Sequence, residues 1–226
     1  MNGADLTNVI PSFIKHSFNN GGQYCYRINR AYIHEDIYDK FMEQFIDGVK
    51  KIKVGIEEDC SMGPLCNSSI LNKSILHIED AVAKGANIQF GGEKIKIANS
   101  DSELFFQPTI IVNANHEMLV MKEETFGPVI GIQKIKSLKE GIRLANDSHY
   151  GLAAYVFTQD SGVGLQASRE LEVGSVWVNN VKQAYYLCPF GGVKGSGQGR
   201  EKSKYGLDEY LNIKTIYLSL PDISDY

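Results

Sequence analysis

Apolar residues recur at three- and four-residue steps in two long segments of this chain. The first segment runs from Asp36 to Lys53, with apolar positions at Ile37, Phe41, Phe45, Val49 and Ile52. The second runs from Ser69 to Lys84 and is followed by Gly85, a residue type that commonly ends helices. Both segments therefore predict amphipathic helices, and each helix must bury one face against another layer of structure.

Short apolar runs alternate with these helical segments. They predict strands at residues 88–90, 109–112, 152–158 and 175–179. Ser137 and Asp160 each stand where a helix N-cap is expected, which predicts two further helices, the first reaching at least residue 145 and the second about residue 171. Alternation at this spacing predicts an α/β fold with an open, mostly parallel sheet covered by helices, and with functional residues in the connecting loops.

The end of the chain follows a different pattern. From Asp208 to Leu220 polar and β-prone residues alternate, and no partner hairpin follows. We expect residues 1–207 to form one α/β domain and residues 208–226 to form a C-terminal strand and tail. Because a lone strand must pair with another strand, this segment is a candidate oligomerisation element and indicates a homo-oligomer.

Composition and charge exclude several classes of function. The 226 residues carry a formal net charge of -4 and no basic patch, which argues against a nucleic-acid partner. The first residues lack a secretory-signal pattern, and no run approaches the roughly 18 apolar residues of a membrane span, so we expect no membrane partner and a cytoplasmic protein. The four cysteines show no Cys-x-x-Cys pair and no histidine at a ligand spacing, so we expect free thiols and no metal site.

Four segments stand out in order along the chain: Asn20-Gly21-Gly22-Gln23-Tyr24-Cys25, Glu123-Glu124-Thr125-Phe126-Gly127-Pro128-Val129, Tyr150-Gly151-Leu152-Ala153-Ala154, and Pro189-Phe190-Gly191-Gly192 continuing to Gly199-Arg200-Glu201. Together they resemble the catalytic domain of the aldehyde dehydrogenase superfamily. Any one of them is weak evidence, but four in register make a chance match very improbable. The resemblance covers essentially the whole chain and implies the fold of that catalytic domain.

The resemblance implies that Cys25 is the nucleophile. The reaction needs a group that adds to an aldehyde carbonyl, forms a thiohemiacetal that can lose hydride, and then leaves from a thioester; a thiolate does all three. A free thiol has a pKa of about 8.5, so the site must supply a base or a positive potential. The other cysteines, Cys60, Cys66 and Cys188, are interpreted as small buried residues.

Glu124 and Phe126 match the family pair that holds the nicotinamide ribose of NAD or NADP. Glu123 is the adjacent alternative, and a solvated acidic turn before Pro128 is the structural alternative. The resemblance also places Tyr24, Tyr26 and Phe190 at the aldehyde site, together with the loop from Asn180 to Cys188. The glycine-rich stretch 191–199 has neither Walker nor Rossmann spacing, so we do not interpret it as a phosphate loop.

Parts that the family reaction needs are missing. Only 24 residues precede Cys25, and the family's general-base glutamate, its Rossmann-type cofactor domain and an oxyanion-binding asparagine would lie further upstream. We therefore expect this chain alone to bind no cofactor and to be inactive as a dehydrogenase. The alternatives are a cofactor-free thiol esterase that uses Cys25, and an inert assembly domain from a truncated gene.

The partner implied by the resemblance is a small-molecule aldehyde. Ser203 matches a serine in the carboxylate-binding set of succinate-semialdehyde dehydrogenases. The family arginine six residues before the nucleophile is Asn19 here, which removes a bidentate carboxylate partner. The sequence therefore leaves the particular aldehyde open, as it does the choice between NAD and NADP.

Overall fold

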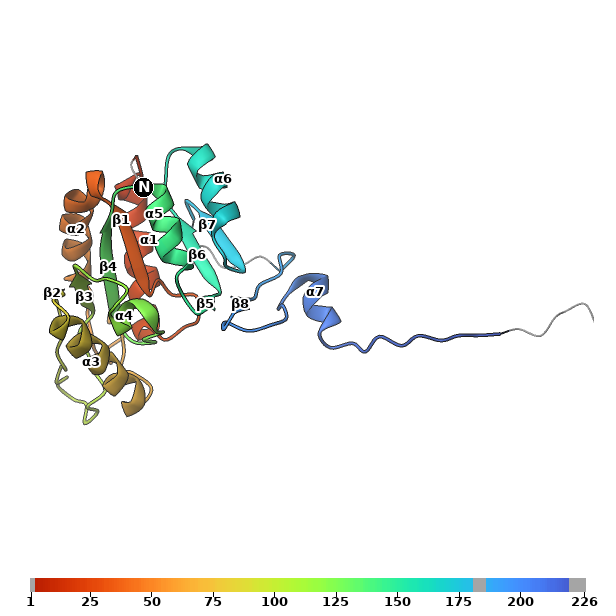
Figure 1. Ribbon diagram of the computed structural model, residues 1–226. Helices are drawn as coiled ribbons and strands as arrows, with labels where there is room; N and C mark the ends of the chain where they lie inside the picture. The colour runs from red at the N-terminus through yellow and green to blue at the C-terminus, as the bar shows by residue number, and fades with distance from the viewer. Residues whose placement is uncertain (1–2, 181–185, 220–226) are drawn as a thin grey trace, which may run out of the picture.

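The computed structural model describes residues 3–180 and 186–219. Its helices, shown in Figure 1, are α1 (Leu6–Phe18), α2 (Glu35–Val49), α3 (Ser68–Ala83), α4 (Leu119–Lys122), α5 (Leu138–Asn146), α6 (Ser161–Glu170) and α7 (Ser203–Asp208), with a 3-10 turn, η1 (Asn19–Gly22), after α1. Its strands are β1 (Arg30–His34), β2 (Asn87–Phe90), β3 (Thr109–Val112), β4 (Val129–Ile135), β5 (Tyr150–Gly151), β6 (Ala153–Val156), β7 (Ser175–Val178) and β8 (Val193–Lys194).

The larger sheet has the strand order β1-β4-β3-β2. β1 and β3 run parallel to the central strand β4, and β2 is antiparallel at the edge. A second parallel pair, β6-β7, and a short antiparallel pair, β5-β8, complete the strands of the described residues. This architecture confirms the predicted α/β fold with an open, mostly parallel sheet.

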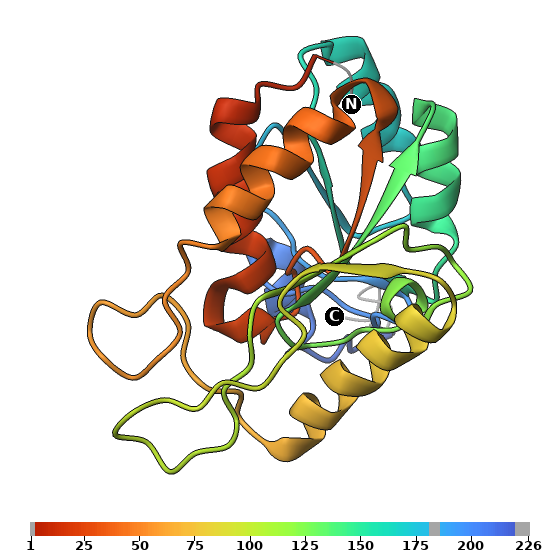
Figure 2. The same cartoon turned by 90° about the vertical axis from the view of Figure 1, so that its left-hand side faces the viewer.

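Alternate residues of β3 point into two separate hydrophobic layers. Ile110 packs with α1 and α2, whereas Ile111 packs with α3 and α4. The two layers follow from the period of two along a strand that is buried on both faces. Figure 2 shows α1 and α2 side by side over the sheet, where the Phe13 and Phe41 rings meet edge to face at 5.1 Å. Each such aromatic ring contributes about 1.5–3 kcal/mol by burial.

The predicted positions of helices and strands agree with those in the structure for most elements. The helices expected over 36–53 and 69–84 are α2 and α3, and the Asn67 side chain caps α3 by accepting from the Ile70 amide at 3.0 Å. The four expected strands are β2, β3, β6 and β7. The sequence reading missed α1, which contains Pro11, and it did not single out β1 or β4.

Within one copy of the chain, the described part of the segment expected as a strand over Asp208–Leu220 does not form one. α7 ends at Asp208, and residues 209–219 form no strand. Figure 1 shows this segment running away from the body of the molecule. A strand exists only as part of a ladder, and no described strand of this chain pairs with the segment. Its apolar side chains are therefore exposed, and Ile213 is 100% accessible.

Among residues 3–180 and 186–219, no helix has the length and apolar character needed to cross a bilayer. The same residues contain no cluster of three or more histidine, cysteine, aspartate or glutamate side chains that could hold a metal ion.

Candidate active site

The loop that carries Cys25 begins with a left-handed turn after α1. Asn20, Gly21 and Gly22 have φ angles of 52°, 64° and 75°. At Gly22 a Cβ atom would lie 2.5 Å from the carbonyl oxygen of Gly127, so no side chain fits there. The glycine thus brings the cysteine loop into backbone contact with the loop that carries Glu124.

Cys25 itself is exposed, and it lines a cavity of about 470 Å³. Glu123 and Glu124 line the same cavity. Gln23, two residues before the cysteine, fixes the loop in two directions: its side-chain amide donates to the Asn20 carbonyl at 2.8 Å, and its side-chain oxygen accepts from the Cys66 backbone amide at 2.7 Å. The thiol therefore projects from a loop whose backbone is held on both sides.

A buried guanidinium joins the two loops. Arg27 is only 6% exposed, donates to the Val129 carbonyl at 2.6 Å and donates to the Asn29 side-chain oxygen at 3.0 Å. Asn29 in turn donates to the Glu123 carbonyl at 3.1 Å and accepts from the Thr125 amide at 3.3 Å. Burial lowers the pKa of Arg27 to about 10, an effect that the neighbouring Tyr24 and Glu124 groups partly oppose, so Arg27 remains a cation at neutral pH.

The Glu124 loop is fixed from its other side by a histidine. His77 is buried, and its Nδ1 lies 3.0 Å from the Thr125 hydroxyl oxygen. Burial, followed by the charge of Lys73, lowers the pKa of His77 to about 4, so the ring is neutral at pH 7. Phe126 has a φ of 56°, an unusual conformation for an aromatic residue, and it turns the chain toward Gly127.

Aromatic side chains gather beside the thiol. The Tyr24 and Tyr26 rings meet at 5.1 Å, and Tyr26 meets Phe190 at 5.9 Å. Trp177 stacks on Tyr155 at 5.2 Å, and Tyr155 donates a hydrogen bond to the Tyr26 carbonyl at 2.6 Å. Burial raises the pKa values of Tyr24 and Tyr155, so neither hydroxyl is a base at neutral pH. The cluster is therefore an apolar wall next to Cys25.

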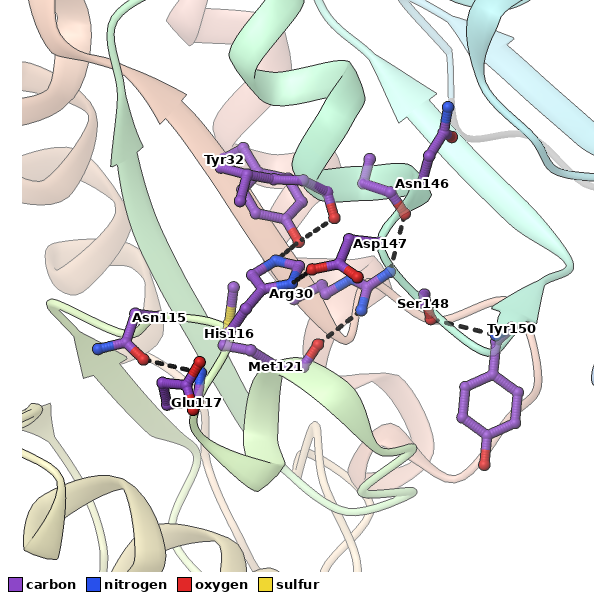
Figure 3. A network of polar contacts seen from close by, with 12 residues as sticks. Arg30, Tyr32, Asn115, His116, Glu117, Met121, Asn146, Asp147, Ser148 and Tyr150 are labelled. Carbon is purple, nitrogen blue, oxygen red and sulfur yellow. Dashed lines mark hydrogen bonds and ion pairs between the residues drawn. The ribbon is translucent and has the colours of Figure 1, made fainter.

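A polar network ties β1 to the segments on either side of the Glu124 loop (Figure 3). The Tyr32 hydroxyl lies 2.8 Å from His116 Nε2, and His116 Nδ1 lies 2.9 Å from Asp147. Arg30 donates to the carbonyls of Met121 at 2.6 Å and of Ala145 at 3.0 Å. These bonds hold the end of α4 and the end of α5 against the first strand of the sheet.

The structure brings together most of the side chains named from the sequence. Cys25 and Glu124 share a cavity, and Tyr24, Tyr26 and Phe190 form one aromatic cluster. Phe126 lies on the same loop as Glu124 but does not line the cavity. Within the loop expected to border the aldehyde site, residues 181–185 lie outside the described residues.

One sequence interpretation is corrected. Cys66 and Cys188 are exposed and Cys60 is half-buried, so these thiols are not the packed core residues expected from composition. All three lie in loops, where short connections leave little apolar surface to cover a side chain. The sequence reading also missed Arg27, Asn29, Tyr155 and Trp177. The last two stand on predicted strands, but they share a face because β6 and β7 pair with Tyr155 opposite Trp177, which the sequence did not show.

Fold and site together define an α/β domain that presents a loop thiol and a carboxylate to one cavity, with an apolar wall at the thiol. Comparison with known proteins gives the family. The model of the aldehyde dehydrogenase family matches residues 1–216, and the chain belongs to this family.

Relatives of known name support the same family. The chain is 43% identical over 215 residues to a mitochondrial succinate-semialdehyde dehydrogenase of Oryza sativa, covering 94% of this chain and 40% of the relative. It is 40% identical over 220 residues to a D-glyceraldehyde dehydrogenase (NADP(+)) of Thermoplasma acidophilum, covering 95% of this chain and 44% of the relative. The chain thus spans less than half the length of these relatives.

Solved structures show the same fold. Succinate-semialdehyde dehydrogenase from Burkholderia pseudomallei superposes with a TM-score of 0.88 at 40% identity, covering 93% of this chain and 43% of that one. Betaine aldehyde dehydrogenase from Staphylococcus aureus in complex with NAD+ gives a TM-score of 0.88 at 37% identity, covering 92% of this chain and 42% of that one.

Proposed function

We propose that this chain is the nucleophile-bearing part of an NAD(P)-dependent aldehyde dehydrogenase, and that Cys25 attacks the carbonyl carbon of an aldehyde. The observation that carries the proposal is the exposed Cys25 thiol on a cavity that it shares with Glu124, within a chain that belongs to the aldehyde dehydrogenase family. A thiolate suits this reaction because it is both a strong nucleophile and an adequate leaving group.

The chemistry at Cys25 follows from its position. Attack of the thiolate forms a carbon–sulfur bond and turns the carbonyl oxygen into an alkoxide, and we propose the Cys25 backbone amide as its hydrogen-bond donor. Loss of a hydride from the same carbon leaves a thioester on Cys25. Hydrolysis breaks the carbon–sulfur bond, releases the carboxylic acid and restores the thiol. The aromatic wall of Tyr24, Tyr26 and Phe190 borders the position of the aldehyde chain.

The residues present fit one end of the cofactor. Glu124 presents a carboxylate to the cavity of Cys25, which suits hydrogen bonds from ribose hydroxyls, and its loop is held by Asn29 and by the His77–Thr125 contact. NAD or NADP, when bound, accepts the hydride. The segment 193–199 is a two-residue strand followed by turns, which does not provide a phosphate-binding helix N-terminus. We propose that the adenine and pyrophosphate sites belong to the part of the full-length relatives that this chain does not cover.

The chain offers internal controls for a test of the nucleophile. Purified protein would be treated with iodoacetamide in the presence and absence of succinate semialdehyde, and in parallel with a neutral aldehyde such as butanal. Peptide mass mapping would follow the labelling rates of Cys25, Cys66 and Cys188, which are all exposed.

The proposal predicts that an aldehyde slows labelling of Cys25 severalfold, because the thiohemiacetal removes the free thiolate, and leaves Cys66 and Cys188 unaffected. Stronger protection by succinate semialdehyde than by butanal would assign a semialdehyde substrate. Equal protection of all three thiols, or none at Cys25, would contradict the role of Cys25.

A further inference from the structure

The aromatic wall beside Cys25 contains a histidine that the proposed reaction does not use. His16 stands in the last turn of α1 and is half-buried. Its ring centroid lies 6.3 Å from that of Tyr24, 6.4 Å from that of Tyr26 and 6.1 Å from that of Tyr155. Tyr24 and Tyr26 are the chain neighbours of Cys25. The imidazole therefore packs among the side chains that flank the nucleophile.

Hydrogen bonds fix the histidine against the cysteine loop. The Tyr24 hydroxyl and the Ile28 amide both donate to the His16 carbonyl, at 2.6 Å and 2.8 Å. Cys25 lies between these two donors in the chain, so a single residue of α1 holds the loop on both sides of the thiol. Burial chiefly raises the pKa values of Tyr24 and Tyr155, and the nearby Cys25 adds to the shift of both. The thiol, the two phenols and the imidazole thus belong to one cluster.

The contacts of His16 assign the position of its hydrogen. The Tyr24 hydroxyl has one proton, which it donates to the His16 carbonyl, and His16 Nδ1 lies 3.3 Å from the same hydroxyl oxygen. Toward Nδ1 that oxygen can only accept, so Nδ1 carries the hydrogen and Nε2 of the neutral ring carries the lone pair. Within residues 3–180 and 186–219, Nε2 has no hydrogen-bond partner. A free basic nitrogen is therefore part of the aromatic wall.

The surroundings of His16 keep its ring neutral. Burial, followed by the charge of Lys15 on the same helix, lowers the pKa of His16 below its ordinary value of 6.5. The titratable groups that face the ring from other elements are the phenols of Tyr24 and Tyr26 on the cysteine loop and of Tyr155 on β6. At pH 7 the ring is therefore unprotonated, which is the state that a general base needs.

We propose that His16 is a general base for hydrolysis of the thioester on Cys25. Nε2 takes a proton from a water molecule while the water oxygen bonds to the thioester carbon. The carbon–sulfur bond then breaks, the Cys25 thiolate leaves, the carboxylic acid is released, and the imidazolium returns its proton to solvent. The inference rests on the proposed function, because that function supplies the thioester. It gives a residue of this chain a role that the resemblance assigns to a glutamate outside residues 1–226.

The first test separates formation of the thioester from its hydrolysis. The chain is acetylated with p-nitrophenyl acetate at pH 7, freed of reagent and sampled over time, and the acetyl group on each cysteine is followed by peptide mass spectrometry. His16→Gln keeps an amide that can donate to Tyr24 but has no basic nitrogen. This variant should acetylate at Cys25 and then lose the acetyl group at least about tenfold more slowly than the wild type.

The chain supplies matched controls for this measurement. His149 is exposed and makes no side-chain hydrogen bond within the described residues, so His149→Gln should hydrolyse the Cys25 thioester at the wild-type rate. Acetyl groups on the exposed Cys66 and Cys188 should decay equally in all three proteins, because neither thiol lies in the aromatic cluster.

The second test asks for basicity, which a purely structural role of His16 does not require. Hydrolysis in the wild type should slow as the pH falls through a value below 6.5, and His16→Gln should lack that step. His16→Ala leaves a gap of imidazole size, so added imidazole should accelerate hydrolysis at Cys25 in this variant severalfold more than in the wild type or in His149→Ala.

The outcomes distinguish the inference from the function on which it rests. If Cys25 is not acetylated in the wild type, the proposed function fails and the inference fails with it. If Cys25 is acetylated but decays equally in the wild type and in His16→Gln, or if imidazole accelerates all variants alike, only the role of His16 is overturned.

Discussion

The backbone of the Cys25 loop touches the backbone of the Glu124 loop at Gly22 and Gly127. This contact holds the loop of the thiol against the loop of the carboxylate, and the buried Arg27 and the half-buried Asn29 hydrogen-bond across the two loops. At the scale of single residues, the site depends as much on these supports as on the side chains that face the cavity.

Substitution of Gly22 by alanine should disrupt this contact. A Cβ there would meet the Gly127 oxygen at 2.5 Å, and the φ of +75° adds about 1–2 kcal/mol of backbone strain for a residue with a side chain. We predict a loss of stability of that size or more in urea unfolding, and slower alkylation of Cys25. Gly63→Ala is the control, because a Cβ at Gly63 has no atom within 4 Å. Equal losses in both variants would show that the contact is not needed.

His77 predicts a specific pH dependence of stability. Its pKa in the folded protein is lowered to about 4, first by burial and then by Lys73, while Glu123 and Asp80 oppose the shift. The unfolded chain therefore takes up a proton near the ordinary value of about 6.5, before the folded chain does, and stability is lost as the pH falls from about 6.5 toward 4.

Urea unfolding of the wild type and of His77→Gln measures this effect. Glutamine keeps a hydrogen-bonding group but does not titrate. The wild type should lose about 2 kcal/mol more than the variant between pH 7 and pH 5. Parallel pH profiles of the two proteins would contradict a neutral buried histidine.

The residues of the site were only partly predictable from the sequence. Cys25 and Glu124 stand in recognisable motifs, and the structure places both on one cavity. Arg27 stands in no motif, and its buried guanidinium depends on the carbonyl of Val129, which lies 102 positions away in the sequence. Trp177 faces Tyr155 because β6 and β7 pair, and that pairing is a property of the fold.

At the scale of elements, the sequence predicted helix starts reliably where a side chain accepts hydrogen bonds from the free amides of the first turn. Ser137 and Asp160 cap helices as expected, and Asn67, which was not singled out, caps α3 in the same way. α1 was not considered in the sequence analysis. It contains Pro11, a residue that usually ends a helix, yet here the helix continues through it and packs on α2. The tail from Asp208 to Leu220 was expected as a strand because polar and β-prone residues alternate there, and such alternation does not supply a partner strand within the same copy.

The cap at Asp160 gives an element-scale prediction. Its carboxylate accepts from the amides of Gly162 at 2.7 Å and Val163 at 3.1 Å. Asp160→Ala should destabilise the protein by about 1 kcal/mol, whereas Asp160→Asn, which keeps the acceptor oxygen, should cost much less. Thermal unfolding of the three proteins makes the comparison, and equal losses in both variants would assign the effect to charge and not to capping.

At the scale of the whole molecule, the chain covers less than half of each relative described above. In the proposed function, Glu124 contacts only the ribose at one end of NAD(P). We therefore predict that isothermal titration calorimetry of the isolated chain shows no heat of binding with either cofactor at millimolar concentration. A sub-millimolar dissociation constant would show that this chain holds a cofactor site of its own.

The most direct test of the central claim uses an activated ester in place of the aldehyde, because acylation of a thiol requires no cofactor. The chain would be incubated with p-nitrophenyl acetate, and acyl adducts would be mapped by mass spectrometry in the wild type, in Cys25→Ser and in Cys66→Ser. We predict an acetyl thioester on Cys25 that forms faster than any adduct at Cys60, Cys66 or Cys188, and that disappears in Cys25→Ser but not in Cys66→Ser. Acylation of another cysteine first, or at equal rates at all four, would contradict the assignment of Cys25 as the nucleophile.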